Sequence, residues 1–139
     1  MSDIKGLEQL TFLEDIRYDQ EHSWARAQGE EVIVGISDFA QDQLGEIVFL
    51  ELPIIGDVFE KGEVFGQAES VKSVSALYLP IGGEIVAVNE NLTDSPDIVN
   101  KHPYENGWMV TVKPNDLSEI TELLSKEEYL NFLRDSESI

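Results

Sequence analysis

Residues 65–80 read FGQAESVKSVSALYLP, and this stretch decides the predicted fold. In a chain with 28 acidic residues, it contains a single acid, Glu69, and a single base, Lys72. Small residues surround the lysine, while residues 63–68 and 77–79 have the apolar and aromatic composition of strands. We therefore expect a β-hairpin that carries Lys72 at its tip, where the side chain is exposed and sterically accessible.

Outside this hairpin, four more segments have the composition of short strands. They are rich in β-branched and aromatic residues, and they span residues 31–36, 46–52, 84–88 and 108–112. Glycine, proline and asparagine separate them, as in the pairs Gly82-Gly83 and Pro114-Asn115. Several short strands with turns at this spacing predict an all-β sandwich or barrel rather than a βαβ fold.

Three short helices are expected between and after the strands. Ser37-Asp38 can cap a helix that ends before Gly45. Ser95 precedes a proline at a first helical position, which predicts one helical turn over residues 96–99. Ser125 and Glu128 form a capping box for a C-terminal helix. The apolar residues of that helix fall on one face and are expected to pack on the sheet: Tyr129, Phe132 and Leu133.

A four-residue repeat supports a two-layer architecture. Gly45-Glu46-Ile47-Val48 recurs as Gly83-Glu84-Ile85-Val86, and each copy is expected to begin a strand. Two similar halves favour a β-sandwich with a pseudo-twofold axis.

Length and composition set the remaining bounds. The chain has 139 residues, 42% of them apolar, and a net charge of −19. One domain of about 100–150 residues is the expectation for this length. The negative charge argues against nucleic acid and anionic membranes as partners. No apolar segment approaches the roughly 20 residues of a membrane helix, and the N-terminal segment is not typical of a secretory signal, so a cytoplasmic location is expected.

The residue types needed for catalysis are scarce. There is no cysteine, and the two histidines, His22 and His102, are far apart in the sequence, so neither a thiol nucleophile nor a metal site is expected. Two interpretations of Lys72 follow from the residues alone. It is an ordinary surface lysine, or it is the acceptor for a covalently attached cofactor, which needs only exposure and a fixed turn. A catalytic base is disfavoured because no second base lies near it in the sequence.

The chain resembles the glycine cleavage system H-protein family over nearly its whole length. The central match is Glu69-Ser70-Val71-Lys72, which is similar to the family's lipoyl-attachment segment. The other residues that carry the resemblance are Arg17-Tyr18, Glu21-His22, Trp24, residues 35–45, Val48-Phe49, Leu52-Pro53, Pro80, Gly83, Ile85, Val88-Asn89, Leu92, Pro96, Asn100, Pro103-Tyr104 and Gly107-Trp108. Biotinyl carriers differ because methionines flank their lysine, and lipoyl domains of 2-oxoacid dehydrogenases differ because they show Asp-Lys-Ala.

The resemblance implies a fold and a function. The fold is mainly β, a lipoyl/biotinyl-type β-sandwich (barrel-sandwich hybrid) with short helices and a C-terminal helix. Residues 1–139 would form one lipoyl-carrier domain, with its core at about 17–113 and a C-terminal helical segment at about 116–134. Lipoate would be joined by an amide bond to Lys72, and the chain would be a carrier subunit without catalytic residues. A lipoate-attaching enzyme, glycine decarboxylase, aminomethyltransferase and dihydrolipoyl dehydrogenase would be its partners.

Two departures from the family pattern bear on the pathway. Ser23 and Ala76 stand where the family usually has acids, which are thought to face a cationic amine on the loaded arm. Glu21 is two residues from Ser23, but on a strand it would share that face only through a different side-chain angle. Loss of both acids favours a lipoate-binding protein of bacterial sulfur oxidation, which works with a heterodisulfide-reductase-like complex. The alternative is a glycine cleavage H protein, and an unmodified interaction protein is a third interpretation.

Overall fold

A computed structural model describes residues 6–137 of the chain. Residues 1–5 and 138–139 lie outside the described part, and the first of these ranges belongs to the N-terminal segment that was not expected to be a secretory signal. In β3 the alternate residues Val32 and Val34 are buried, on the face that packs into the core. One antiparallel sheet has six strands, in the order β1 (Arg17–Tyr18), β2 (Ser23–Gln28), β3 (Glu31–Ile36), β9 (Val110–Pro114), β8 (Gly83–Val88) and β5 (Val58–Phe59).

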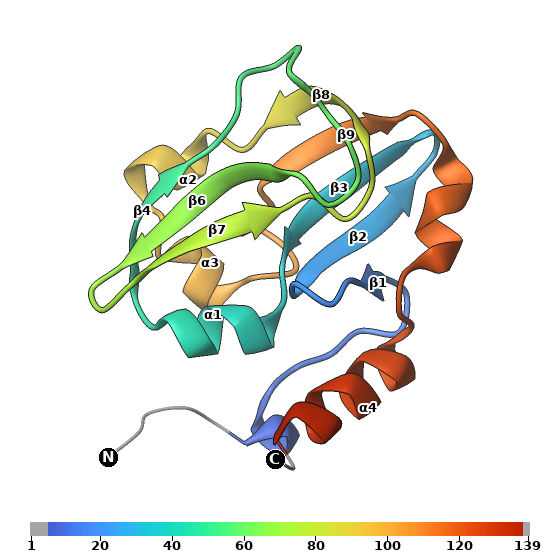
Figure 1. Ribbon diagram of the computed structural model, residues 1–139. Coiled ribbons are helices and arrows are strands. Elements are labelled where there is room, and N and C mark those ends of the chain that lie inside the picture. The colour runs from blue at the N-terminus through green and yellow to red at the C-terminus, as the bar shows by residue number, and fades with distance from the viewer. Residues whose placement is uncertain (1–5, 138–139) are drawn as a thin grey trace.

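The second sheet has three antiparallel strands and packs against the first. Its order is β4 (Ile47–Glu51), β6 (Val64–Ser70) and β7 (Val74–Tyr78). In Figure 1 the β6–β7 hairpin lies in front of the larger sheet and projects to one side. The two layers and the core between them confirm the predicted β-sandwich. The repeated Gly-Glu-Ile-Val segments lead into β4 and β8, one in each sheet.

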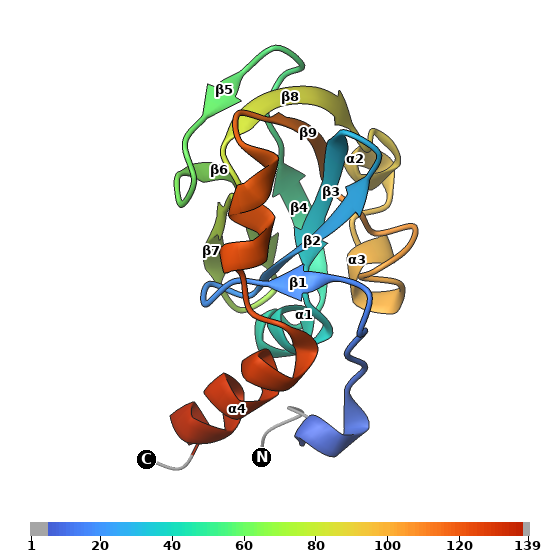
Figure 2. The same ribbon diagram turned by 90° about the vertical axis from the view of Figure 1, so that its right-hand side faces the viewer.

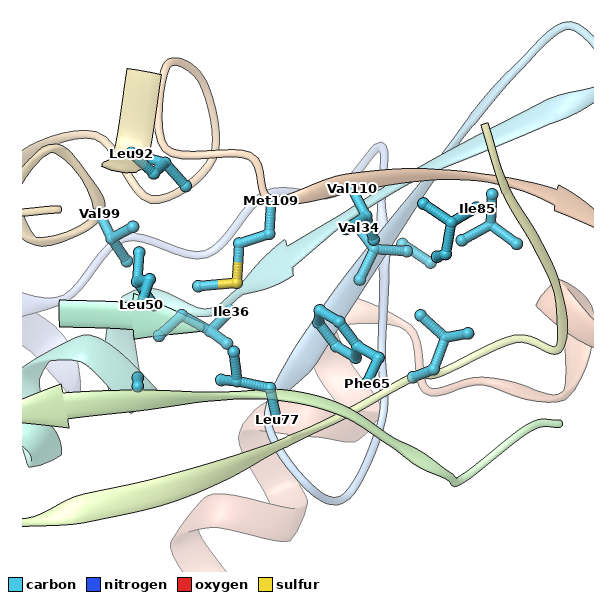
Figure 3. Close-up of a cluster of buried hydrophobic side chains, with 14 of the residues drawn as sticks. Val34, Ile36, Leu50, Phe65, Leu77, Ile85, Leu92, Val99, Met109 and Val110 are labelled. Carbon is cyan, nitrogen blue, oxygen red and sulfur yellow. The ribbon is translucent and has the colours of Figure 1, made fainter. Parts of the chain in front are cut away.

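The core fills the space between the sheets. Figure 3 shows Phe65 of the small sheet pointing toward Val34 of the large one, and Leu77 pointing toward Ile36. Met109 is fully buried in the same cluster. Burial of apolar side chains at about 25 cal/mol per Å² is the main term that holds the two layers together.

Short helices close the ends of the sandwich. They are α1 (Asp38–Leu44), α2 (Asn91–Asp94), α3 (Ile98–Lys101) and α4 (Lys126–Glu137), with 3₁₀ helices η1 (Leu7–Gln9) and η2 (Leu117–Glu122). Within the described part of the chain, no helix is both long and apolar enough to cross a bilayer. As predicted, Ser37 caps α1 by accepting from the Ala40 N–H, and Gly45, with φ of 81°, ends it.

The C-terminal helix is where the capping box predicted it. The Ser125 N–H donates to Glu128, and the Glu128 N–H donates back to Ser125. Its apolar face packs on the large sheet at the β1 edge. Tyr129 stacks on Tyr18 of the edge strand β1, with 4.4 Å between ring centroids, in a second cluster that also contains Trp24 of β2 and the N-terminal Phe12. Figure 2 shows α4 below this end of the sandwich.

Two predicted boundaries were wrong by two residues. The turn expected at 96–99 is helical at Ile98–Lys101, because Ser95 accepts from the Ile98 N–H through its carbonyl rather than acting as a side-chain cap. The strand expected from 108 begins at Val110, because the Trp108 carbonyl accepts from the Asn89 side chain and the Trp108 N–H donates to Glu105. Strands β1, β2 and β5 and helix α2 were not predicted.

Candidate functional site

Lys72 lies at the turn of the β6–β7 hairpin, where the flanking pattern predicted it. The Ser70 hydroxyl organises the turn by accepting from the Lys72 N–H at 3.2 Å and the Ser73 N–H at 3.1 Å. The Ser70 N–H donates to the Ser73 carbonyl, and the Val71 N–H donates to the carbonyl of Glu46, the residue before β4. The backbone under the lysine is therefore fixed, while its side chain is exposed.

The lysine side chain runs along the end of α1. A Cβ built on Gly45 would lie 3.1 Å from Lys72 Cε and 3.6 Å from Nζ, so a glycine at this position leaves room for the lysine. Lys72 makes no ion pair with any residue of 6–137. Beside it is a groove of about 520 Å³ that α1 and α3 border, with Asp42, Glu46 and Asp97 among its lining residues.

A second cavity, of about 390 Å³, lies on the other side of α1. It brings together β7, the start of β2, the end of β3 and one side of α1. The lining residues are Glu21, His22, Ser23, Ile36, Phe39, Ala40, Gln43, Leu44, Ser75, Ala76, Leu77 and Tyr78. Ser23 and Ala76, the two positions that depart from the family pattern, thus line the same cavity.

Ser23 and Ala76 contribute to the wall of this cavity in different ways. Ser23 is 1% exposed, and its hydroxyl donates to the Tyr78 carbonyl at 2.6 Å, which ties β2 to β7. That bond shows that the Tyr78 carbonyl points away from β6.

The backbone of Ala76 also points away from β6. The Ser73 carbonyl and the Leu79 N–H form hydrogen bonds on the β6 side, and residues of an antiparallel strand alternate between bonding to the neighbour and pointing away from it. The N–H and carbonyl of Ala76 therefore point away from β6. β7 is an edge strand, so its unpaired edge borders the cavity.

Glu21 lines this cavity as well, where we expected it to share the face of Ser23 only through a different side-chain angle. It is not on a strand, because β2 begins at Ser23. His22 has φ of 76°, and this left-handed residue changes the direction of the chain between Glu21 and Ser23. Both residues line the same cavity.

Asp19 holds this turn together. Its carboxylate accepts from the Glu21 N–H at 3.0 Å and from the Ser23 N–H at 2.9 Å. The Asp19 N–H donates to the Ser23 carbonyl, and the His22 N–H donates to the Asp19 carbonyl. Burial raises the pKa of Asp19 to about 6, while the two backbone donors oppose that shift.

His22 contributes packing rather than charge to the cavity. Burial lowers the pKa of His22, so its imidazole is neutral at pH 7. Its Nδ1 lies 2.9 Å from the Tyr129 hydroxyl, which is also 2.8 Å from the Ser37 hydroxyl. This three-residue contact links α4, the N-cap of α1 and the turn before β2. The sequence singled out each segment, but no pattern in it indicates that they meet.

The chain is similar to known proteins over most of its length. A family model described as "Glycine cleavage H-protein" matches residues 16–136. The glycine cleavage system H protein of Anaeromyxobacter sp. (strain K) is 48% identical over 124 residues, covering 89% of this chain and 97% of that protein. The protein of the same name from Geobacillus kaustophilus is 55% identical over 115 residues, covering 83% and 91%.

A solved structure has a similar fold. The crystal structure of a glycine cleavage system H protein from Mycobacterium marinum matches with a TM-score of 0.79 and 36% sequence identity. The match covers 86% of this chain and 97% of that one.

Proposed function

Because the chain belongs to the glycine cleavage H-protein family, we propose that it is a lipoyl carrier of the glycine cleavage system, with lipoate joined by an amide bond to Lys72. The observation that carries the proposal is an exposed lysine on a hydrogen-bonded hairpin turn whose outgoing strand, β7, lines a preformed cavity. Ala76, on the cavity wall, follows Lys72 by four residues, and four residues of chain span at most about 14 Å. A lysine extended by a lipoyl chain, with about eleven bonds from Cα to the ring, is long enough to cover that distance.

A lipoyl group on Lys72 would supply the dithiol chemistry that a chain without cysteine lacks, as needed to carry the methylamine unit of glycine. The residues of the chain perform the other tasks. The turn built on Ser70 presents Lys72 to partner enzymes. The apolar side chains of Ile36, Phe39 and Leu77 line the cavity and limit the access of water to whatever it holds. The chain itself acts as a carrier, not as an enzyme.

The sulfur-oxidation interpretation is not supported. The relatives described above are named for glycine cleavage, and they match this chain over more than four fifths of its length. The argument for sulfur oxidation was the loss of two acids at Ser23 and Ala76. The position of Glu21 on the wall of the same cavity weakens that argument.

The partners we propose are the lipoate-attaching enzyme, glycine decarboxylase, aminomethyltransferase and dihydrolipoyl dehydrogenase. Tethering to Lys72 raises the effective concentration of the dithiol at each of their active sites. Acidic residues beside the lysine, such as Glu46 and Asp97, favour docking to basic surfaces.

The mass of the protein tests the attachment site. We expect wild type incubated with a lipoate-attaching enzyme, ATP and lipoate to gain the mass of one lipoyl group, located on Lys72 by peptide mapping. Lys72→Arg should gain nothing. Lys113→Arg, a matched change at an exposed lysine of β9, should behave like wild type. Modification of the Lys72→Arg protein, or none of wild type, would contradict the proposal.

A further inference from the structure

We propose that Asn100 is a positioning residue for lipoylation, because its side chain holds the backbone segment that supports the Lys72 turn. Asn100 belongs to α3, which lies beside α1 in Figure 1, and it lines the groove next to Lys72. The inference rests on the proposed function. It adds a residue that acts through the backbone rather than on the cofactor itself.

The Asn100 side chain makes three hydrogen bonds to the end of α1 and the start of β4. Its Nδ2 donates to the Gly45 carbonyl at 2.8 Å and to Gln41 Oε1 at 2.9 Å, and its Oδ1 accepts from the Ile47 N–H at 2.9 Å. Both hydrogens of Nδ2 are thus used. One side-chain amide therefore fixes the backbone on both sides of Glu46.

Two backbone contacts join this segment to the turn. The Glu46 carbonyl accepts from the Val71 N–H at 3.2 Å, directly before the lysine. Ile47 pairs with Ser70 in the register of β4 and β6, and the Ser70 hydroxyl accepts from two N–H groups of the turn. The segment that Asn100 holds therefore fixes the hairpin at the point where the chain turns.

The lysine side chain lies against the same segment. A Cβ built on Gly45 would lie 3.1 Å from Lys72 Cε, so a small movement of this backbone changes the room that the lysine has. Asn100 holds the Gly45 carbonyl in place. Without that bond, we expect the turn and the lysine to populate more conformations, and an enzyme that binds one of them must bear the cost of ordering the rest.

Lipoyl transfer needs one nitrogen in one position. The neutral amine of Lys72 attacks the carbonyl carbon of lipoate that ATP has activated as an adenylate. An amide bond forms, the bond from carbon to the phosphate oxygen breaks with its electron pair leaving on AMP, and the nitrogen gives up a proton. The enzyme has to bind the hairpin before this step. A loosened turn should therefore raise the KM for the carrier more than it lowers kcat.

Asn89 provides a matched control at another place in the fold. Its Nδ2 also donates twice, to the carbonyls of Asn106 and Trp108 at 2.8 Å each, and its Oδ1 also accepts a backbone N–H. The two asparagines therefore make the same number of side-chain hydrogen bonds. Asn89 is not among the residues that line the groove with Asn100 and Lys72. Replacing either one lowers stability, but the inference expects only Asn100 to affect the Lys72 turn.

The test compares unlipoylated wild type, Asn100→Ala and Asn89→Ala as substrates of a lipoate-attaching enzyme supplied with lipoate and ATP. We expect Asn100→Ala to raise the KM for the carrier about tenfold, with kcat within about twofold of wild type, and Asn89→Ala to keep both values. Hydrogen exchange gives a second readout. The Val71 amide should exchange about tenfold faster in Asn100→Ala, and at the wild-type rate in Asn89→Ala.

A milder pair of variants covers the case in which Asn100→Ala does not fold. Asn100→Asp keeps the acceptor for the Ile47 N–H and loses both donated bonds, so it should raise KM in the same direction, while Asn89→Asp should not. Equal KM values for the two members of a pair would overturn the inference, whether both are raised or neither is. So would wild-type exchange of the Val71 amide in a folded Asn100 variant. A wild type that accepts no lipoate would instead refute the proposed function, and the inference with it.

Discussion

Glu21 and Ser23 line the same cavity, and the residue between them does not belong to a strand. A regular strand would also place residues 21 and 23 on one face. His22 instead has a left-handed conformation, within the turn that the Asp19 carboxylate holds. The sequence analysis identified both residues. It could not predict the positive φ of His22, because glycine and asparagine are the residues that usually indicate such a conformation.

Asp19, whose carboxylate accepts two backbone hydrogen bonds in this turn, should have a measurable effect on stability. The pKa of Asp19 is raised to about 6 in the folded protein from an ordinary value of 3.8, so the folded state binds the proton more tightly. The contribution of Asp19 to the free energy of unfolding therefore falls as pH rises from about 4 to about 6, by up to about 3 kcal/mol, and then stays level.

Asp19→Asn removes this titration but keeps an acceptor oxygen. We expect its free energy of unfolding, relative to wild type, to increase between pH 4 and pH 7. Urea titrations of both proteins at several pH values measure the difference. A difference that stays constant over this range would mean that burial does not perturb the Asp19 carboxyl group.

At the scale of elements, capping signals located helices better than composition located strands. Ser37 with Gly45, and Ser125 with Glu128, marked α1 and α4 because each signal satisfies backbone groups locally. β2 reads SWARAQ and carries no strand pattern. It is a strand because β3 pairs with it over six residues, and such pairing is not visible in the segment itself.

The contact between α4 and the cavity turn gives a prediction at this scale. Tyr129→Phe keeps the ring stacked on Tyr18 but removes the hydroxyl that His22 and buried Ser37 contact. We expect a loss of about 1–3 kcal/mol in the free energy of unfolding, because buried polar groups lose a partner.

Tyr78→Phe is a matched control for this change. Its hydroxyl has no hydrogen bond to any residue within 6–137, so we expect a loss below about 0.5 kcal/mol. Chemical denaturation measures both variants. Equal stability of Tyr129→Phe and wild type would mean that the hydroxyl contacts contribute nothing net.

For the whole molecule, the two-layer sandwich and the exposed Lys72 could be predicted from strand composition, turn spacing and the family resemblance. The cavity could not be predicted in the same way. It joins the start of β2 to β7 through the hydrogen bond from Ser23 to Tyr78, across 55 positions of the chain. Contacts between elements so far apart follow from the packing of the sheets, which no local pattern specifies.

The net charge of −19 gives a prediction for the whole molecule. Electrostatic attraction to basic surfaces accelerates encounter, and salt screens it over a Debye length of about 8 Å at physiological ionic strength. We expect the association rate with glycine decarboxylase to fall about tenfold or more between about 0.02 and 0.5 M salt. Stopped-flow measurements test this, and a rate independent of salt would exclude electrostatic steering.

The central claim is that the chain is a glycine cleavage carrier that works through Lys72. The most direct measurement is the intact mass of the lipoylated protein after incubation with glycine decarboxylase and glycine. We predict the added mass of one methylamine unit, dependent on glycine and absent from Lys72→Arg. A fully lipoylated wild-type protein that gains no such mass, beside a glycine cleavage H protein that does, would contradict the account.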